Sequence, residues 1–138
     1  MRTMRIGACH CGAVRFEVDL DEDAIPLNRC NCSLCRRRGA VMTSVPLDRF
    51  RLLAGAETLS LYRWNSGVAK HYFCSRCGIY THHQRRSAPE QYAVNVACLV
   101  GGDLSLGRTV GELDGASNSL VGVAQDPPPA TVPGKAIT

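Results

Sequence analysis

Short runs of alternating apolar and polar residues characterise this chain between residues 14 and 97. Val14, Phe16 and Val18 alternate with charged residues, which is the period of a half-buried β-strand. Similar runs occur at residues 40–45, 50–53, 59–64, 71–73 and 92–97, and turn residues such as glycine, proline and asparagine separate them. Helical periodicity is confined to two short segments, Ser33–Arg38 and Leu47–Arg49. The pattern therefore predicts a mostly β fold built from several small sheets.

The amino-acid composition of the chain changes after residue 100. Glycine, serine and aspartate become frequent, and four of the seven prolines fall within residues 125–138. A chain of 138 residues is long enough for a single domain. We therefore expect one domain over residues 1–122 and a Pro-rich C-terminal tail over residues 123–138.

Composition points to an ordinary globular protein in a reducing compartment. Apolar residues make up 45% and charged residues 20% of the chain, and no apolar run approaches the roughly 20 residues that span a bilayer. The first nine residues contain two arginines and no apolar segment, so we expect no signal peptide and no membrane partner. The expected location is cytoplasmic.

Cysteine is the residue type that says most about function. The chain has eight cysteines in 138 residues, about 6%, which is below the roughly 8–10% of a disulfide scaffold. In a reducing compartment, clustered cysteines indicate metal or redox chemistry. Seven of them form three clusters, which are Cys9-x-Cys11, Cys30-x-Cys32-x-x-Cys35 and Cys74-x-x-Cys77.

Seven thiolates divide naturally into a closed set of four and an open set of three. Gly12 and Gly78 directly follow two of the clusters, and a glycine there allows backbone N–H groups to turn toward sulfur. We therefore expect one structural zinc site and one three-thiolate zinc site with an open position for a substrate. The two ligand sets are Cys9, Cys11, Cys74 and Cys77, and Cys30, Cys32 and Cys35.

A histidine could instead complete the second site as an eighth ligand. The candidates are His10, His71, His82 and His83, of which His82 and His83 suit the role better than His10, which lies between two cysteines. Zinc in a three-ligand site is held less firmly, so we expect the second ion to be labile.

Net charge changes once metal is considered. The formal charge of +4 falls to about +1 when seven thiolates bind two Zn²⁺ ions. Bulk charge therefore gives no support for binding to nucleic acid.

Three motifs resemble a known enzyme family. They are residues 7–16 (GACHCGAVRF), residues 30–36 (CNCSLCR) and residues 73–78 (FCSRCG). In order and spacing, residues 6–100 are similar to the glutathione-dependent formaldehyde-activating enzyme family, which includes the centromere protein V group. The resemblance implies an Mss4-like fold of small coiled antiparallel sheets, two zinc ions and a carbon–sulfur lyase. It places the structural zinc on Cys9, Cys11, Cys74 and Cys77, and the catalytic zinc on Cys30, Cys32 and Cys35.

The resulting hypothesis is the addition of a thiol such as glutathione to a small aldehyde such as formaldehyde, or the reverse cleavage. Zinc would hold the incoming thiol as its thiolate. Arg36 is the first candidate for binding the carboxylates of glutathione, and Arg85 is a second. Either His82 or His83 could shuttle a proton, and we choose His82. Strand alternation would send the two histidines to opposite faces.

Two other classes of function stay open. A non-catalytic zinc-binding module could contact an acidic partner or nucleic acid through residues 36–38 and 82–86, although the single tryptophan offers little for base stacking. A methionine sulfoxide reductase would need Cys98 as its nucleophile, but the apolar neighbours of Cys98 disfavour a low thiol pKa. The sequence also leaves open whether the chain forms a homodimer.

Overall fold

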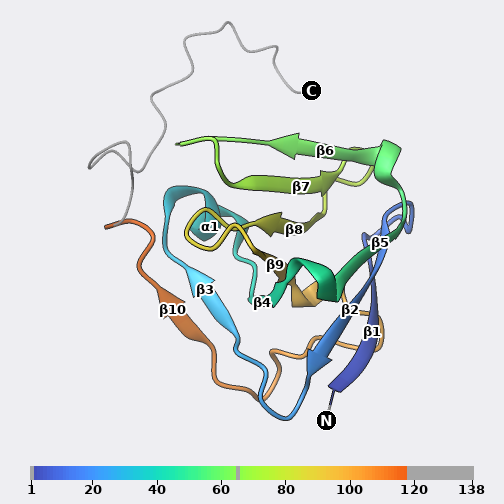
Figure 1. Ribbon diagram of the computed structural model, residues 1–138, viewed down its shortest axis with the longest axis horizontal. Coiled ribbons are helices and arrows are strands. Elements are labelled where there is room, and N and C mark those ends of the chain that lie inside the picture. The colour runs from blue at the N-terminus through green and yellow to red at the C-terminus, as the bar shows by residue number, and fades with distance from the viewer. Residues whose placement is uncertain (1, 65, 118–138) are drawn as a thin grey trace, which may run out of the picture.

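Two β-sheets make up the fold, which a computed structural model describes for residues 2–64 and 66–117 (Figure 1). The smaller sheet has three antiparallel strands in the order β1-β2-β5. Its strands are β1 (Arg2–Ala8), β2 (Arg15–Asp21) and β5 (Phe50–Ala54). The predicted Pro-rich tail over residues 123–138 and the end of the predicted domain lie outside the described residues.

The larger sheet has seven strands in the order β10-β3-β4-β9-β8-β7-β6. Neighbouring strands are antiparallel except for β10, which runs parallel to β3. The strands are β3 (Asn28–Cys30), β4 (Met42–Pro46), β6 (Leu59–Tyr62), β7 (Lys70–Cys74), β8 (Tyr80–Gln84), β9 (Gln91–Asn95) and β10 (Gly111–Leu113). The helical elements are α1 (Ser33–Arg38) and the 3-10 turns η1 (Leu47–Arg49), η2 (Ala56–Thr58) and η3 (Val96–Cys98).

The hydrophobic core joins the two sheets. Phe16 and Val18 of β2 contribute to it from the smaller sheet, and Val45 of β4 and Val94 of β9 contribute from the larger one. The rings of Phe16 and Phe50 stack with their centroids 4.9 Å apart. Because each fully buried side chain of this kind stabilises the fold by about 1.5–3 kcal/mol, this layer fixes how the sheets sit on each other.

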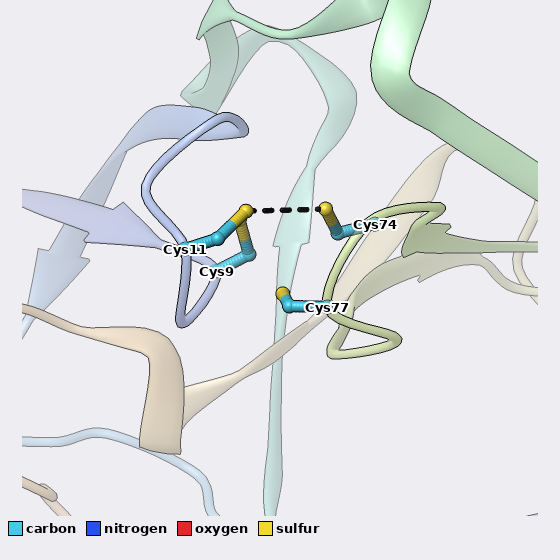
Figure 2. Close-up of side chains that lie close together, drawn as sticks. All are labelled: Cys9, Cys11, Cys74 and Cys77. Atoms are coloured by element: carbon cyan, nitrogen blue, oxygen red, sulfur yellow. Dashed lines mark hydrogen bonds between the residues drawn. The ribbon is translucent and has the colours of Figure 1, made fainter.

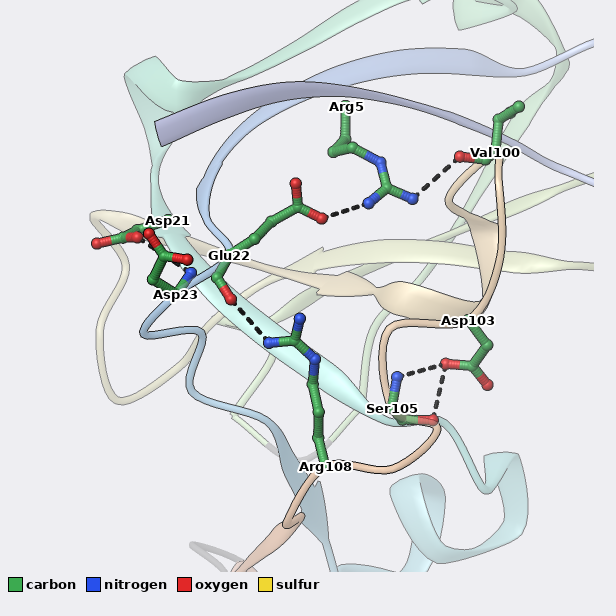
Figure 3. Close-up of polar contacts among 8 residues, drawn as sticks. All are labelled: Arg5, Asp21, Glu22, Asp23, Val100, Asp103, Ser105 and Arg108. Atoms are coloured by element: carbon green, nitrogen blue, oxygen red, sulfur yellow. Dashed lines mark hydrogen bonds and ion pairs between the residues drawn. The ribbon is translucent and has the colours of Figure 1, made fainter. Parts of the chain in front are cut away.

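Polar contacts fasten the segment after η3 to the smaller sheet (Figure 3). Arg5 on β1 pairs with the carboxylate of Glu22 and also donates a hydrogen bond to the carbonyl of Val100 at 3.0 Å. Arg108 donates to the backbone carbonyl of Glu22 at 2.8 Å. These contacts hold the segment between η3 and β10 against the smaller sheet and the turn after β2.

The mostly β prediction is confirmed, and each predicted run contains or overlaps an observed strand. The run at residues 92–97 ends as the 3-10 turn η3 rather than as a strand, while α1 and η1 form where helical turns were expected. The sequence pattern missed β1, β3, β8 and β10. β3 and β10 have three residues each, and β8 has no aliphatic residue, so neither length nor alternation marks them. The longest helix in the described part of the chain has six residues, too few to cross a membrane.

A close approach in the smaller sheet gives a test of this packing. Gly7 pairs with Phe16, and a Cβ added at Gly7 would lie 2.1 Å from the Phe16 ring, which is 0% exposed. Gly7→Ala should therefore lower the free energy of unfolding by about 1–3 kcal/mol, measured by urea denaturation. Met4→Ala on the same strand, where the side chain is 55% exposed, should change it by less than about 0.5 kcal/mol. Equal stabilities of the two variants would contradict this packing.

Candidate metal centres and the cavity beside them

The first cysteine cluster brings together two loops that are far apart in the sequence. Cys9 and Cys11 follow β1, whereas Cys74 ends β7 and Cys77 lies in the next turn. Figure 2 shows the four side chains converging, and their sulfur atoms all lie within 4.8 Å of one another. The sulfur of Cys11 is 3.6 Å from that of Cys9 and 3.7 Å from that of Cys74.

These distances fit one tetrahedral ion. A Zn–S distance of about 2.3 Å implies sulfur–sulfur edges of about 3.8 Å, close to the two separations above. All eight cysteines are free thiols, so disulfides do not compete for these sulfurs. The donor set and its geometry fit a closed, structural site.

Each half of this cluster contains a glycine with a positive φ angle. Gly12 and Gly78 have φ of 80° and 77°, a conformation that favours glycine, and their N–H groups donate to the carbonyls of Cys9 and Cys74. Backbone N–H groups also point at sulfur, from Val14 to Cys9 at 3.3 Å and from Arg76 to Cys74 at 3.4 Å. The structure thus brings together the four cysteines that the glycine pattern grouped.

The second cluster comes from one short stretch of chain. Cys30 ends β3, Cys32 caps the N-terminus of α1 and Cys35 lies within α1, and their sulfurs are within 4.8 Å of one another. The backbone N–H of Cys35 donates to the sulfur of Cys32 at 3.3 Å. Hydrogen bonds from the thiols of Cys30 and Cys35 are the main causes that lower the pKa of Cys32, so this thiol ionises first. Among the described residues, no fourth cysteine, histidine or carboxylate joins this group.

The three-cysteine cluster lies in the wall of a cavity of about 610 Å³. This volume is in the range of about 300–1,000 Å³ that small-molecule sites occupy. None of the four cysteines of the first cluster is among the described residues that line it. The three-cysteine site therefore has access to a ligand-sized space.

Strand register decides which side chains face this cavity. Four residues on neighbouring strands pair in one row across the larger sheet and line the cavity: His71, His83, Ala93 and Ser44. The residues beside them in sequence pair in a second row: Tyr72, His82, Val94 and Thr43. Because successive residues of a strand point to opposite faces, the second row faces away from the cavity.

His82, chosen from the sequence as the proton carrier, therefore lies on the face of the sheet opposite the cavity. His82 is 4% exposed, and its ring lies 4.3 Å from that of Phe50 and 4.7 Å from that of Tyr72, on the core side of the sheet. Burial lowers the pKa of His82 to about 3, so it is neutral at pH 7. The expectation that His82 and His83 face opposite sides holds, and His83 is the one at the cavity.

A polar network supports the cavity wall behind the two histidines. Nη1 of Arg38 lies 3.3 Å from Nδ1 of His71, and the guanidinium sits 3.6 Å above the ring of Tyr80. The hydroxyl of Tyr80 in turn hydrogen-bonds Nδ1 of His83. Burial lowers the pKa of His71 to about 4 and that of His83 to about 3, so both rings are neutral at pH 7.

The two arginines proposed to bind substrate carboxylates lie in different places. Arg85 lines the cavity and is held by the side-chain oxygen of Gln91 at 2.7 Å. Arg36 is exposed and is not among the described residues that line the cavity.

Cys98 does not have the surroundings of a nucleophile. It is 8% exposed, its thiol lies 3.5 Å from the carbonyl of Tyr80, and burial raises its pKa to about 12. A buried thiol of this kind is a small core side chain. The sulfoxide reductase hypothesis therefore loses the residue on which it depended.

The end of β10 and the two residues after it complete the cavity wall, and no sequence pattern marks them. Leu113, Asp114 and Gly115 line it, and Asn31 fastens this segment through hydrogen bonds with the side chain of Asp114 at 3.1 Å and the N–H of Ala116 at 2.9 Å. A Cβ at Gly115 would lie 2.5 Å from the sulfur of Cys30. This part of the cavity wall is thus packed directly against the three-cysteine cluster.

This close approach predicts the effect of a small side chain at position 115. In Gly115→Ala, the added methyl group should displace Cys30 and lower metal affinity at the three-cysteine site by about tenfold or more. Competition with a chromogenic chelator would measure this, and the four-cysteine site in the same chain is the internal control. Unchanged affinity at both sites would show that the segment moves aside freely.

The buried His82 predicts a specific acid sensitivity. The unfolded chain protonates this imidazole below about pH 6.5, whereas the folded chain does so only near pH 3, so stability falls as pH drops through this window. Between pH 7.5 and pH 5, His82 should account for about 2 kcal/mol of lost stability. In His82→Phe, urea denaturation should show a loss smaller by that amount. Equal losses in the two proteins would contradict the burial of a neutral imidazole.

Comparison with known proteins agrees with this geometry. The family model of the glutathione-dependent formaldehyde-activating enzyme matches residues 4–106. Two curated relatives carry that enzyme's name provisionally. The protein from Halomonas elongata is 39% identical over 79 residues, and the match covers 51% of this chain and 50% of the relative. The protein from Penicillium rubens is 30% identical over 76 residues, and the match covers 52% of this chain and 39% of the relative. This chain thus matches half or less of the length of these relatives.

A solved structure shares the fold. The crystal structure of a Rhodobacter sphaeroides protein, a structural genomics target, is 52% identical in sequence and superposes with a TM-score of 0.71. The match covers 77% of this chain and 98% of that one. With the family model matching well over half of its length, the chain belongs to the glutathione-dependent formaldehyde-activating enzyme family.

Proposed function

We propose that this protein is a zinc-dependent enzyme that adds a thiol such as glutathione to a small aldehyde such as formaldehyde, or catalyses the reverse carbon–sulfur cleavage. The observation that carries the proposal is the position of Cys30, Cys32 and Cys35 in the wall of a ligand-sized cavity. Membership of the family and the names of the relatives support the choice of thiol and aldehyde. The four-cysteine cluster would hold a second, structural zinc.

The three cysteines suit the delivery of a thiolate. Cys30, Cys32 and Cys35 would hold a zinc ion, which would favour the deprotonated form of a thiol bound beside them. The electron density of the three thiolates would keep the sulfur of that thiol nucleophilic. The chain's own contribution is therefore to gather the sulfurs of Cys30, Cys32 and Cys35 in the wall of the cavity.

Arg85 would orient the thiol substrate. Glutathione carries two carboxylates, and a guanidinium binds a carboxylate through two parallel hydrogen bonds. The contact of Arg85 with Gln91 fixes one side of its guanidinium at the cavity wall. This arrangement favours a substrate whose thiol and carboxylate ends reach the cysteine cluster and Arg85 together.

In the proposed reaction, the thiol loses its proton to solvent and its sulfur forms a bond to the carbonyl carbon. The electron pair of the carbonyl π bond moves to oxygen, which then takes up a proton. The product is a thiohemiacetal, and the sum of thiol and aldehyde equals the product in atoms and electrons.

Metal content and thiol response test this proposal. Wild-type protein reconstituted with Co²⁺ should bind two ions per chain, Cys32→Ser should bind one, and glutathione should change the visible spectrum of the wild type only. The wild type should also accelerate the combination of glutathione and formaldehyde, followed by NMR exchange spectroscopy, and Cys32→Ser should not. Cys98→Ser, which changes a cysteine outside both clusters, is the matched control and should retain both ions.

If glutathione left the visible spectrum of the second Co²⁺ ion unchanged, this result would contradict the enzymatic mechanism. The same holds for a wild type that leaves the uncatalysed rate unchanged. Either result would favour a zinc-stabilised binding module, in which both cysteine clusters serve the fold.

A further inference from the structure

His71 has a buried ring nitrogen that the proposed function does not yet use. The side chain is 4% exposed and lies in the cavity wall with the three cysteines. Its Nε2 is buried and has no hydrogen-bond partner, a property shared in the described part of the chain only with the hydroxyl of Thr43. Burying a polar atom without a partner is unfavourable, so this nitrogen calls for an explanation.

The other ring nitrogen fixes where the hydrogen of His71 resides. Nη1 of Arg38 is 3.3 Å from Nδ1, and a guanidinium can only donate hydrogen bonds. Nδ1 must therefore accept, and the neutral ring carries its hydrogen on Nε2. Arg38 is itself held in place over the ring of Tyr80, at 3.6 Å, so the tautomer is set by a supported contact.

Nothing in the described protein accepts the hydrogen of Nε2, including the sulfurs of the neighbouring cysteines. His71 and the three cysteines nevertheless line the same cavity. The natural acceptor is therefore an atom of a molecule bound in the cavity beside the three sulfurs. Among the reactants, the aldehyde oxygen gains negative charge as sulfur attacks.

We infer that the Nε2–H of His71 donates a hydrogen bond to the aldehyde oxygen in the transition state of thiol addition, which makes His71 a catalytic residue. This inference rests on the proposed function. The new bond joins sulfur to the carbonyl carbon, and the π electron pair moves to oxygen. His71 keeps its proton throughout, and the oxygen is protonated afterwards by water. A fixed donor aimed at developing charge typically accelerates a reaction by about 10²–10³-fold.

The neighbouring histidine has a different role. His83 lies beside His71 with the ring centroids 4.8 Å apart, and its Nδ1 is already paired with the hydroxyl of Tyr80. It packs against His71 and helps to hold the ring in its plane. The hydroxyl of Tyr80 can donate or accept, so it does not set which nitrogen of His83 carries the hydrogen, whereas the guanidinium of Arg38 sets this for His71.

Two substitutions at position 71 separate the hydrogen bond from the ring. His71→Phe retains an aromatic ring and removes the donor, whereas His71→Gln retains an N–H donor at a similar reach. With zinc-loaded protein, glutathione and formaldehyde, kcat of His71→Phe should fall by about 10²-fold with metal content unchanged, and His71→Gln should recover at least tenfold of that loss. His82→Phe, the same change on the opposite face of the sheet, is the control and should stay within about twofold of the wild type.

A spectroscopic measurement tests the donor independently of activity. Long-range ¹H–¹⁵N correlation spectra of the wild type at pH 7 should show His71 as the neutral tautomer with its hydrogen on Nε2. A hydrogen on Nδ1, or a charged ring, would overturn the inference. This measurement also decides the question if neither variant at position 71 folds.

The activity outcomes distinguish the two proposals. An active wild type with an equally active His71→Phe would overturn the role of His71 and leave the proposed function standing. A His71→Gln variant as impaired as His71→Phe would show that the imidazole acts in some way other than as a hydrogen-bond donor. A wild type that does not accelerate the reaction would overturn both proposals.

Discussion

The strict alternation of side chains along a β-strand is the constraint on which both the core and the cavity depend. Consecutive residues of β4, β7, β8 and β9 supply two parallel rows, one packed toward the smaller sheet and one facing the cavity. A shift of one residue in any of these strands would exchange the rows. The apolar contacts of Phe16, Phe50 and Val94 fix the register from the core side, and so they also fix which histidine meets the three-cysteine cluster.

The two cysteine clusters differ in how the fold brings their sulfur atoms together. Cys9 and Cys11 meet Cys74 and Cys77 across the junction of the two sheets, so a metal ion there would cross-link the fold. Cys30, Cys32 and Cys35 come from six consecutive residues and gain their shape from the start of α1. Local backbone geometry therefore suffices to gather three sulfurs in the wall of the cavity.

Much of this arrangement could be predicted from the sequence, because cysteine spacing and the turn glycines impose short-range requirements. The grouping of the sulfurs follows from Gly12 and Gly78, and the opposite orientation of His82 and His83 follows from strand alternation. Which of the two faces the cavity depends on contacts with Phe50 and Tyr72, which come from other strands. The position of Arg36 depends on the direction of a six-residue helix. β10 forms by pairing with the edge of β3, a contact that its own three residues do not indicate.

The separation of the clusters along the chain has a consequence for biosynthesis. The sulfurs of residues 30–35 leave the ribosome together, so this cluster can gather while most of the chain is still unmade. The other cluster must wait for Cys77, and closing that long loop costs more conformational entropy. Gly115 emerges later still and covers Cys30 only after both sets of ligands are complete. The three-cysteine cluster can thus gather early in synthesis, whereas the residues that complete the wall of the cavity beside it are made late.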